Sequence, residues 1–453
     1  MTCDASTADD LAVLLAERDA EALLFRRAGA SLTAAHFLRD VQRVAAGLPE
    51  ADHCLNLCQD RYAFTVALAA AALRGQVSLL SSDRSAASLA GLNGRFERVI
   101  AVSEAPAADI PLRHHVLALP HDPVAGTPPN PLIPADRLVA IVFTSGSTGT
   151  PVGYRKTWGA ITERSRAAGL RFGMLAAAPA GVVGTVPPQH MYGFETTILL
   201  PLHAMAASWS GPAFYPIDIR DALLAMPAPR VLVTTPLQIR ALLDNGMALP
   251  PLQAVISATA PLDPVLAAAA EQHWAAPVLE IFGATEVGSI ASRRTVAGPA
   301  WTTYDGIRLL QAGTEQVLIA APHAEPHPLA DRVEALSPVE FRLLGRNADM
   351  VKLGGRRASL GGLNAILLSL PGVEDGVFIA PDDLDQRPGA RLLVFAVAPG
   401  LSADDILSAL RERIEPVFLP RRVIRLGALP RNEAGKIPRA ALLDLLAPDA
   451  GPR

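Results

Sequence analysis

The segment from Phe143 to Trp158, FTSGSTGTPVGYRKTW, has the composition of an anion-binding loop. Glycines let a backbone approach a phosphate closely, and successive N–H groups and Ser/Thr hydroxyls donate hydrogen bonds to its oxygens. The segment follows LVAIVFT, an apolar run that predicts a buried strand, and ligand-binding loops commonly follow such strands. The G-x-x-x-x-G-K-[ST] spacing of a P-loop is absent. Taken alone, the segment is also compatible with a flexible turn.

Lysine is rare in this chain, so its positions are informative. Among 40 Lys and Arg residues, only Lys156, Lys352 and Lys436 are lysines. A skewed genomic base composition would produce the same bias. Against that background, each lysine marks a place where a compact ammonium is expected to be needed in preference to a guanidinium.

The overall composition excludes several classes of protein. Half of the 453 residues are hydrophobic, 19% are charged and the net charge is −4, as in a globular enzyme of two or three domains. Such a chain has no general attraction to nucleic acid or anionic membranes. Any phosphate chemistry must therefore come from local sites.

Two features predict a cytoplasmic protein without a membrane span. The first ten residues lack an apolar signal core, and the most apolar window, residues 64–80, is interrupted by Arg74 and Gly75. This window is expected to be a core helix and strand. Cys3, Cys54 and Cys58 fit a reducing compartment, and we expect buried thiols at Cys54 and Cys58 in preference to a zinc site.

Apolar runs and helical segments alternate through the middle of the chain. The predicted strands are LVAIVFT, RVLVTT, QAVIS and PVLEIF, and the helices between them are PLQIRALLDN and LDPVLAAAAEQHW. This rhythm predicts an α/β fold with mixed sheets flanked by helices. After FRLLGRNADMVKLGGRR, the strands DGVFIA and RLLVFAVAP and the helix ADDILSALRERI predict a small, mobile α+β domain. We expect an N-terminal domain at residues 1–345, a hinge at 346–349 and a C-terminal domain at 350–453.

Five motifs in order identify a family resemblance. They are FTSGSTGTPVG, IFGATEVG, LADRVEAL, GRNADMVKLGGRR and LPRNEAGKIPRAAL. This series resembles the adenylate-forming (AMP-binding) superfamily of acyl-CoA synthetases, aryl-acid ligases, peptide-synthetase adenylation domains and luciferases. The resemblance extends from the segment RYAFTVALAAAALRG to the C-terminus. More narrowly, the chain resembles the stand-alone aryl-acid ligases of bacterial aryl-polyene and xanthomonadin-type pigment pathways.

The resemblance implies an ATP site. The Ser/Thr/Gly loop would wrap the β- and γ-phosphates, Phe282 would stack on adenine, and Asp331 would receive the ribose hydroxyls. Thr285 would contact the α-phosphate and Glu286 would bind Mg²⁺, a hard cation that prefers carboxylate oxygen. The full set of implied ATP-binding residues is Thr144, Ser145, Gly146, Ser147, Thr148, Gly149, Thr150, Ala258, Thr259, Phe282, Gly283, Ala284, Asp331 and Arg346.

The same resemblance implies the catalytic and acid-binding residues. Lys436, which follows a glycine in NEAGKIPR, would bridge the acid and the α-phosphate, where negative charge develops. Thr285 and Glu286 would assist it. His190, in VPPQHMYGFETT, either orients the carboxylate or satisfies a loop hydrogen bond. The implied acid-binding residues are His190, Tyr192, Gly193 and Gly283, with Phe194 in the pocket wall.

A second reaction step follows from the resemblance. The small domain would rotate about the hinge and bring a hairpin containing Lys352, Gly355 and Arg357 toward the active site. A pantetheine thiol would then take the acyl group. We expect a separate acyl carrier protein as the acceptor and an aromatic acid such as hydroxybenzoate as the substrate; Arg411, Arg413, Arg421 and Arg422 could meet an acidic carrier. Coenzyme A is the alternative acceptor.

Several positions depart from the family pattern. Val152 replaces the usual lysine of P-K-G, and Lys156 either supplies that charge or packs at a helix start. Ala348 occupies the usual charged hinge position, with Asp349 next to it. Residues Gly361, Gly362 and Asn364 stand where acidic residues often occur. These departures leave open a non-catalytic nucleotide-binding homologue, which the presence of Glu286 and Lys436 disfavours.

Overall fold

The computed structural model describes most of the chain. The described residues are 11–81, 86–106, 110–119, 128–144, 152–175, 178–312, 316–329, 331–346, 350–353, 356–381, 391–431 and 437–446. They belong to two compact units, which are described separately. The first unit comprises Met1–Arg308 and Ile319–His327, and the second comprises Leu309–Leu318 and Pro328–Arg453. The domain boundary and hinge expected at 345–349 remain predictions, since residues 347–349 lie outside the described part.

One six-stranded sheet of the first unit contains the strand that leads into the Ser/Thr/Gly loop. Its order is β10-β9-β5-β4-β6-β7, parallel throughout except for the antiparallel pair β9–β10. The strands are β4 (His53–Asn56), β5 (Val77–Leu80), β6 (Val99–Ser103), β7 (Arg113–Val116), β9 (Leu138–Thr144) and β10 (Val152–Thr157). The sequence LVAIVFT was correctly predicted to be a strand: its five residues from Val139 to Phe143 are buried.

Among the described residues, three helices belong to the same part of the chain as this sheet. The helices of this part of the chain are α1 (Ala34–Gly47), α2 (Arg61–Leu73) and α3 (Ala86–Arg95). Helix α2 is buried almost throughout and begins at the N-cap Asp60, whose carboxylate accepts from the Ala63 N–H. Together, α2 and β5 confirm the core helix and strand expected in residues 64–80.

A second, larger sheet carries most of the predicted site segments. Within the first unit its order is β17-β16-β15-β14-β13-β11-β12-β2-β3. The central strands from β15 to β12 run parallel, whereas β16 and β17 are antiparallel. The strands are β2 (Leu23–Arg27), β3 (Ala30–Thr33), β11 (Ala180–Gly184), β12 (Ala206–Trp209), β13 (Arg230–Thr234), β14 (Ala254–Ser257), β15 (Val278–Ala284), β16 (Gly288–Arg294) and β17 (Ala300–Thr303).

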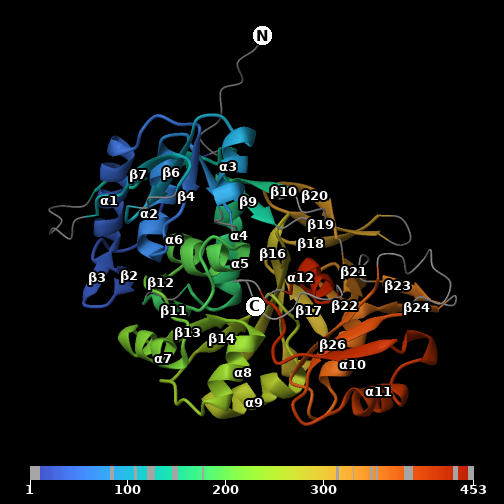
Figure 1. The fold of residues 1–453 in the computed structure, drawn as a ribbon. Helices are drawn as coiled ribbons and strands as arrows, with labels where there is room; N and C mark the ends of the chain where they lie inside the picture. The colour runs from blue at the N-terminus through green and yellow to red at the C-terminus, as the bar shows by residue number, and fades with distance from the viewer. Residues whose placement is uncertain are drawn as a thin grey trace. The chain divides into compact units, whose positions relative to one another are not determined.

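Crossover helices link the parallel strands, as the sequence predicted. Helix α8 has Thr235 as its N-cap and α9 has Asp263, and a proline occupies the first turn of each, where its missing N–H costs nothing. They lie side by side (Figure 1). The helical segments of this region are α4 (Trp158–Arg171), α5 (Met191–Gly193), the π-helix η2 (Phe194–Leu199), α6 (Leu200–His203), α7 (Pro216–Ala225), α8 (Pro236–Asp244) and α9 (Pro264–Trp274).

Two predictions made from composition concern the cysteines and the absence of a membrane span. Cys54 and Cys58 are buried free thiols, and burial raises the pKa of Cys54 to about 12. Both thiols lie in the hydrophobic core, as expected. Among the described residues no cluster of histidine, cysteine and carboxylate side chains could hold a metal ion. None of the helices in the described ranges combines the length and apolarity needed to cross a bilayer.

The second unit is a small α+β assembly, as expected. Strands β25, β26 and β27 form a sheet whose core includes Phe378, Val394, Ile406 and Leu410. The elements are β21 (Asp331–Ser337), β22 (Glu340–Arg346), β23 (Met350–Leu353), β24 (Arg356–Ser359), α10 (Leu360–Leu368), β25 (Asp375–Ile379), β26 (Leu393–Val397), α11 (Ala403–Arg411), β27 (Arg422–Arg425) and α12 (Arg439–Asp444). The predicted strands DGVFIA and RLLVFAVAP and the predicted helix ADDILSALRERI are β25, β26 and α11.

Candidate active site

The segments predicted to bind substrate meet at one edge of the larger sheet. Strands β11, β13, β14 and β15 are parallel, so their carboxyl ends lie together, the usual ligand-binding edge of an α/β sheet. The hydroxyls of Thr185 and Thr234, which follow β11 and end β13, are 3.0 Å apart. The loops VPPQHMYG and SATAPL and the motif IFGATEVG all begin at this edge.

The motif IFGATEVG forms the end of β15, a tight turn and the start of β16. Gly283 is required there, because a Cβ atom would lie 2.5 Å from the Gly288 carbonyl oxygen. Thr285 and Glu286 occupy the turn and are half-buried. Within the described part of the chain, the Glu286 carboxylate has no hydrogen-bond or ion-pair partner, whereas its backbone carbonyl is bound. A free, half-buried carboxylate fits the expected Mg²⁺ ligand.

Lys156 has a role that the sequence left open. It lies on β10 opposite Ala140 of β9, and its side chain is only 5% exposed. Its ammonium donates to the carbonyl oxygens of Thr285 and Glu286, at 2.5 and 2.9 Å. Burial lowers the pKa of Lys156 to about 8. The lysine therefore contacts the turn of IFGATEVG, and the neighbouring hairpin residue Val152 is 45% exposed.

Two further charged residues contact the same turn and were missed from the sequence. Arg164 of α4 donates to the Val287 carbonyl oxygen. The Glu195 carboxylate, in η2, accepts from the Ser289 N–H at 3.0 Å and from the Ser289 hydroxyl. Both are 7% exposed. The only signal in the sequence was an acidic residue inside the apolar run YGFETTILL, directly after the predicted acid-binding loop.

The predicted acid-binding loop is held by its own residues. His190 is the N-cap of α5, and the Tyr192 hydroxyl donates to the Thr234 and Ile256 carbonyl oxygens at 3.0 and 2.8 Å. Gly193 packs so closely that a Cβ atom would overlap the Pro187 carbonyl oxygen. Tyr192 therefore fixes the ends of β13 and β14. Substrate contacts of His190, Tyr192 and Gly193 remain predictions, as does the place of Phe194 in the pocket wall.

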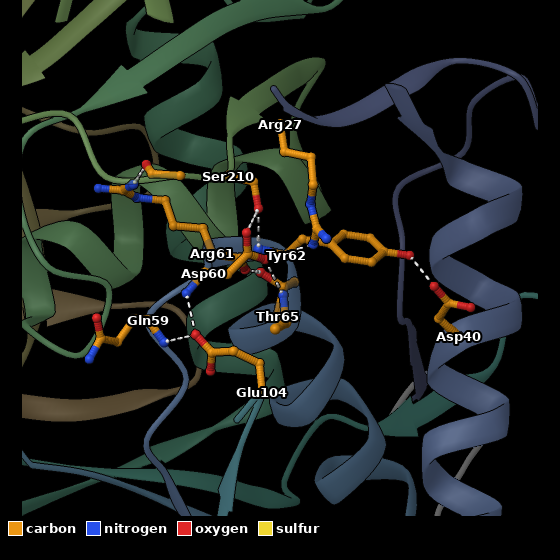
Figure 2. Close-up of polar contacts among 11 residues, drawn as sticks. Arg27, Asp40, Gln59, Asp60, Arg61, Tyr62, Thr65, Glu104 and Ser210 are labelled. Atoms are coloured by element: carbon orange, nitrogen blue, oxygen red, sulfur yellow. Dashed lines mark hydrogen bonds and ion pairs between the residues drawn. The ribbon is translucent and has the colours of Figure 1, made fainter. Parts of the chain in front are cut away.

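Arg61 is a buried arginine at the start of helix α2, which lies beside the six-stranded sheet, and it binds the backbone at the start of this loop. The Arg61 guanidinium donates to the carbonyl oxygens of Gly184, Val186 and Gly211 at 2.8, 2.9 and 2.7 Å. Figure 2 shows Arg61 beside Asp60, whose carboxylate accepts from Ser210 at 2.6 Å. From the sequence alone, an arginine at the start of a helix is expected to lie at the surface. Here it ties α2 to the carboxyl ends of β11 and β12.

The expected adenine side of the site departs from ideal backbone geometry. Ala258 is buried, and Thr259 has φ of 77°, a left-handed conformation that a β-branched residue adopts only at a cost. The Phe282 ring is 9% exposed and lies 5.6 Å from the Trp301 ring. Stacking of Phe282 on adenine remains a prediction.

The second unit contains the other predicted residues. Asp331 of β21 is the cross-strand partner of Arg346 of β22, and Lys352 of β23 is the partner of Arg357 of β24. These pairings place each expected pair side by side on the backbone of a hairpin. Their roles, like those of Thr144 and Ala284 in the first unit, remain predictions. The predicted residues Ser145, Gly146, Ser147, Thr148, Gly149, Thr150, Gly355 and Lys436 lie outside the described residues.

Both flanks of the segment that contains Lys436 are anchored in the second unit. On one side, Arg431 forms a two-pronged ion pair with Asp375, with Nη2 at 2.8 and 2.7 Å from the two carboxylate oxygens. On the other side, Leu442 of α12 is 1% exposed and packs with Phe395 and Leu429. A salt bridge therefore holds Arg431 before this segment, and a small apolar cluster holds α12 after it.

Comparison with known proteins assigns the class. Residues 13–318 match the family model described as AMP-binding enzyme, which covers more than half of the chain. The chain therefore belongs to the AMP-binding enzyme family. A 4-coumarate–CoA ligase of Rhodobacter capsulatus is 30% identical over 309 residues, covering 66% of this chain and 74% of that protein. A probable 2-succinylbenzoate–CoA ligase of Mycobacterium tuberculosis is 27% identical over 349 residues, covering 70% and 86%.

Solved structures confirm the fold. ATP-bound MatB from Rhodopseudomonas palustris superimposes with a TM-score of 0.76 at 20% identity, covering 94% of this chain and 96% of that one. The o-succinylbenzoate coenzyme A synthetase MenE from Bacillus subtilis, in complex with AMP, also gives 0.76, at 16% identity and with 93% and 95% coverage. The protein is an enzyme of the AMP-binding family, consistent with an AMP-forming acid–thiol ligase.

Proposed function

We propose that this enzyme uses ATP to convert an aromatic carboxylic acid, such as a hydroxybenzoate, into an acyl-AMP, and then transfers the acyl group to a pantetheine thiol. The observation that carries the proposal is the junction between two motifs. The hairpin β9–β10, which flanks the Ser/Thr/Gly loop, is joined through Lys156 to the turn that contains Thr285 and Glu286. A triphosphate loop, a hydroxyl and a metal-binding carboxylate are the groups that adenylation needs.

In the first step, a carboxylate oxygen attacks the α-phosphorus of ATP, and the bond to the leaving pyrophosphate breaks. Thr285 donates to the α-phosphate, and Lys436 neutralises the charge shared by the acid and the phosphate. Glu286 holds Mg²⁺, which supplies Lewis-acid stabilisation of the phosphate oxygens when bound. The Ser/Thr/Gly loop orients the β- and γ-phosphates.

In the second step, the thiol sulfur attacks the acyl carbonyl, the bond to AMP breaks, and the thiol proton is released. The hairpin β23–β24, with Lys352, Gly355 and Arg357, replaces Lys436 at the site after rotation about residues 346–349. The reaction takes place in the cytoplasm, where ATP and reduced thiols are available.

The pantetheine thiol belongs either to coenzyme A or to an acyl carrier protein. The curated relatives named above are CoA ligases of acids that contain a benzene ring, which supports coenzyme A and an aromatic substrate. A carrier protein, as in the aryl-polyene ligases, is supported by four exposed arginines of the second unit. These are Arg411, Arg413, Arg421 and Arg422.

Acid-dependent exchange of label between pyrophosphate and ATP tests the first step across aromatic and fatty acids. We expect exchange with at least one aromatic acid and less with fatty acids. Mass detection of the product, with coenzyme A and a phosphopantetheinylated carrier protein offered separately, then identifies the acceptor. A folded protein that binds ATP but exchanges with no acid in the panel would support the non-catalytic alternative.

A further inference from the structure

Three buried charged residues surround the backbone of one turn. Lys156 comes from β10, Arg164 from α4 and Glu195 from η2, and we call them the charged bracket. They bind three consecutive carbonyl oxygens, those of Thr285, Glu286 and Val287, and the N–H and hydroxyl of Ser289. These are the residues of the turn that presents the Thr285 hydroxyl and the Glu286 carboxylate.

The cost of burying these charges argues for a specific purpose. Their side chains come from residues only 5–7% exposed, and a buried charge is tolerated only when it is paired and hydrogen-bonded. Fully bonded buried networks hold one geometry, which is the property required of groups that must meet a reacting centre.

We propose that the charged bracket is a positioning device that sets Thr285 and Glu286 for the nucleotide and its metal ion, and that Lys156 acts through the turn's backbone instead of on a phosphate. The proposal rests on the proposed function. Under this proposal, Lys156 does not replace the lysine that Val152 removes from the Ser/Thr/Gly loop. Its ammonium is already bound to the carbonyl oxygens of Thr285 and Glu286.

Glu195 extends this device to the acid-binding loop. It lies three positions after Tyr192, and η2 continues directly from α5. Its carboxylate is thus attached to the loop that contains His190 and bonded to the backbone of Ser289. Through Glu195, the acid-binding loop and the turn have a shared, fixed spacing.

Kinetics of pyrophosphate exchange separate positioning from phosphate binding. In Lys156→Met, which keeps the length of the side chain and removes its charge, we expect kcat to fall about tenfold or more. The Mg²⁺ concentration for half-maximal exchange should rise several-fold, and the KM for ATP should change little. We expect methylammonium to restore part of the activity of Lys156→Ala. If Lys156→Met instead raised the KM for ATP about tenfold and left kcat unchanged, the proposal would be wrong.

Hydrogen exchange supplies a readout that does not depend on activity. In Lys156→Met and Glu195→Gln, we expect faster amide exchange in a peptide that spans residues 284–291, measured on protein without substrates. If the rate of amide exchange in residues 284–291 were unchanged in both variants, the proposed role of the charged bracket would be wrong, whichever substrate the enzyme proved to act on. If Lys156→Met does not fold, Glu195→Gln provides the same test.

Arg18→Met is the matched control. Arg18 is a half-buried cation whose guanidinium also donates to backbone carbonyls, those of Ala16, Ala206 and, at 2.8 Å, Ala204. Ala204 precedes β12, at the edge of the sheet opposite the site. We expect this variant to lose stability without faster exchange in residues 284–291 and without a change in kcat for the folded fraction. If Arg18→Met changed amide exchange in residues 284–291 and kcat as much as Lys156→Met does, the charged bracket would only stabilise the fold in general, which would contradict the proposal.

Discussion

At the scale of single residues, charge placement and backbone geometry distinguish this chain from its family pattern. Val152 is exposed where a lysine is usual, and Lys156 is buried against the carbonyls of the neighbouring turn. A sequence shows that a lysine is present four positions later. It does not show that its partners lie 129 and 130 positions away.

Thr259 gives a prediction at this scale. Its φ of 77° is strained for a β-branched residue and ordinary for glycine, and its side chain is exposed. We expect Thr259→Gly to raise the free energy of unfolding by about 1 kcal/mol, measured by urea denaturation. The neighbouring Ala260→Gly serves as the control and should be destabilising. Destabilisation of both by the same amount would show that no strain is stored at Thr259.

At the scale of elements, the ion pair between Arg431 and Asp375 lies directly before the segment that contains Lys436. In Arg431→Gln, we expect the kcat of pyrophosphate exchange to fall about tenfold, because small displacements of a reacting group are costly. Arg342→Gln is the control, since Arg342 pairs with Glu334 in the same unit and both side chains are half exposed. It should leave exchange nearly unchanged. Equal kinetics of the two variants would exclude a positioning role for the Arg431 pair.

Helix α6 gives a pH-dependent prediction. Burial, assisted by Arg166 and Arg18, lowers the pKa of His203 from 6.5 to about 3. Between these values the unfolded chain binds a proton at His203 and the folded chain does not, so stability falls as the pH drops below 6.5. From pH 7.5 to 5.5, the wild type should lose about 1 kcal/mol more of its unfolding free energy than His203→Gln does. Parallel losses in urea titrations would show that His203 titrates normally in the folded state.

At the scale of the whole molecule, local patterns predicted elements well and their meeting points poorly. Helices α8 and α9 were predictable because an N-cap and a proline mark each start. Strands β9, β13, β14 and β15 were predictable from buried apolar runs. The family motifs identified the turn of Thr285 and Glu286 as a candidate site.

The supports of the site could not be predicted, for a physical reason. Arg61, Arg164 and Glu195 act through contacts with residues 94 to 150 positions distant, as in the bonds of Arg61 to Gly211 and of Glu195 to Ser289. Hydrophobic periodicity reports only which face of an element is buried. It does not report which charged residue will be buried with a partner from another element.

The two units also divide the proposed chemistry between them. Thr285 and Glu286 belong to the first unit, whereas Asp331, Lys352 and Lys436 belong to the second. Each unit therefore contributes residues to the proposed reaction. Mutations in either unit should affect the same exchange reaction, which makes that reaction the natural assay.

The central claim is that this enzyme forms an acyl-AMP with Lys436 at the reacting phosphate. The most direct measurement is acid-dependent ATP–pyrophosphate exchange by the wild type and by Lys436→Ala, with ATP binding measured by calorimetry as a check of folding. We predict exchange by the wild type with an aromatic acid, and loss of exchange in Lys436→Ala while ATP binding persists. Near-normal exchange in Lys436→Ala, or no exchange by a folded, ATP-binding wild type with any acid, would contradict the account.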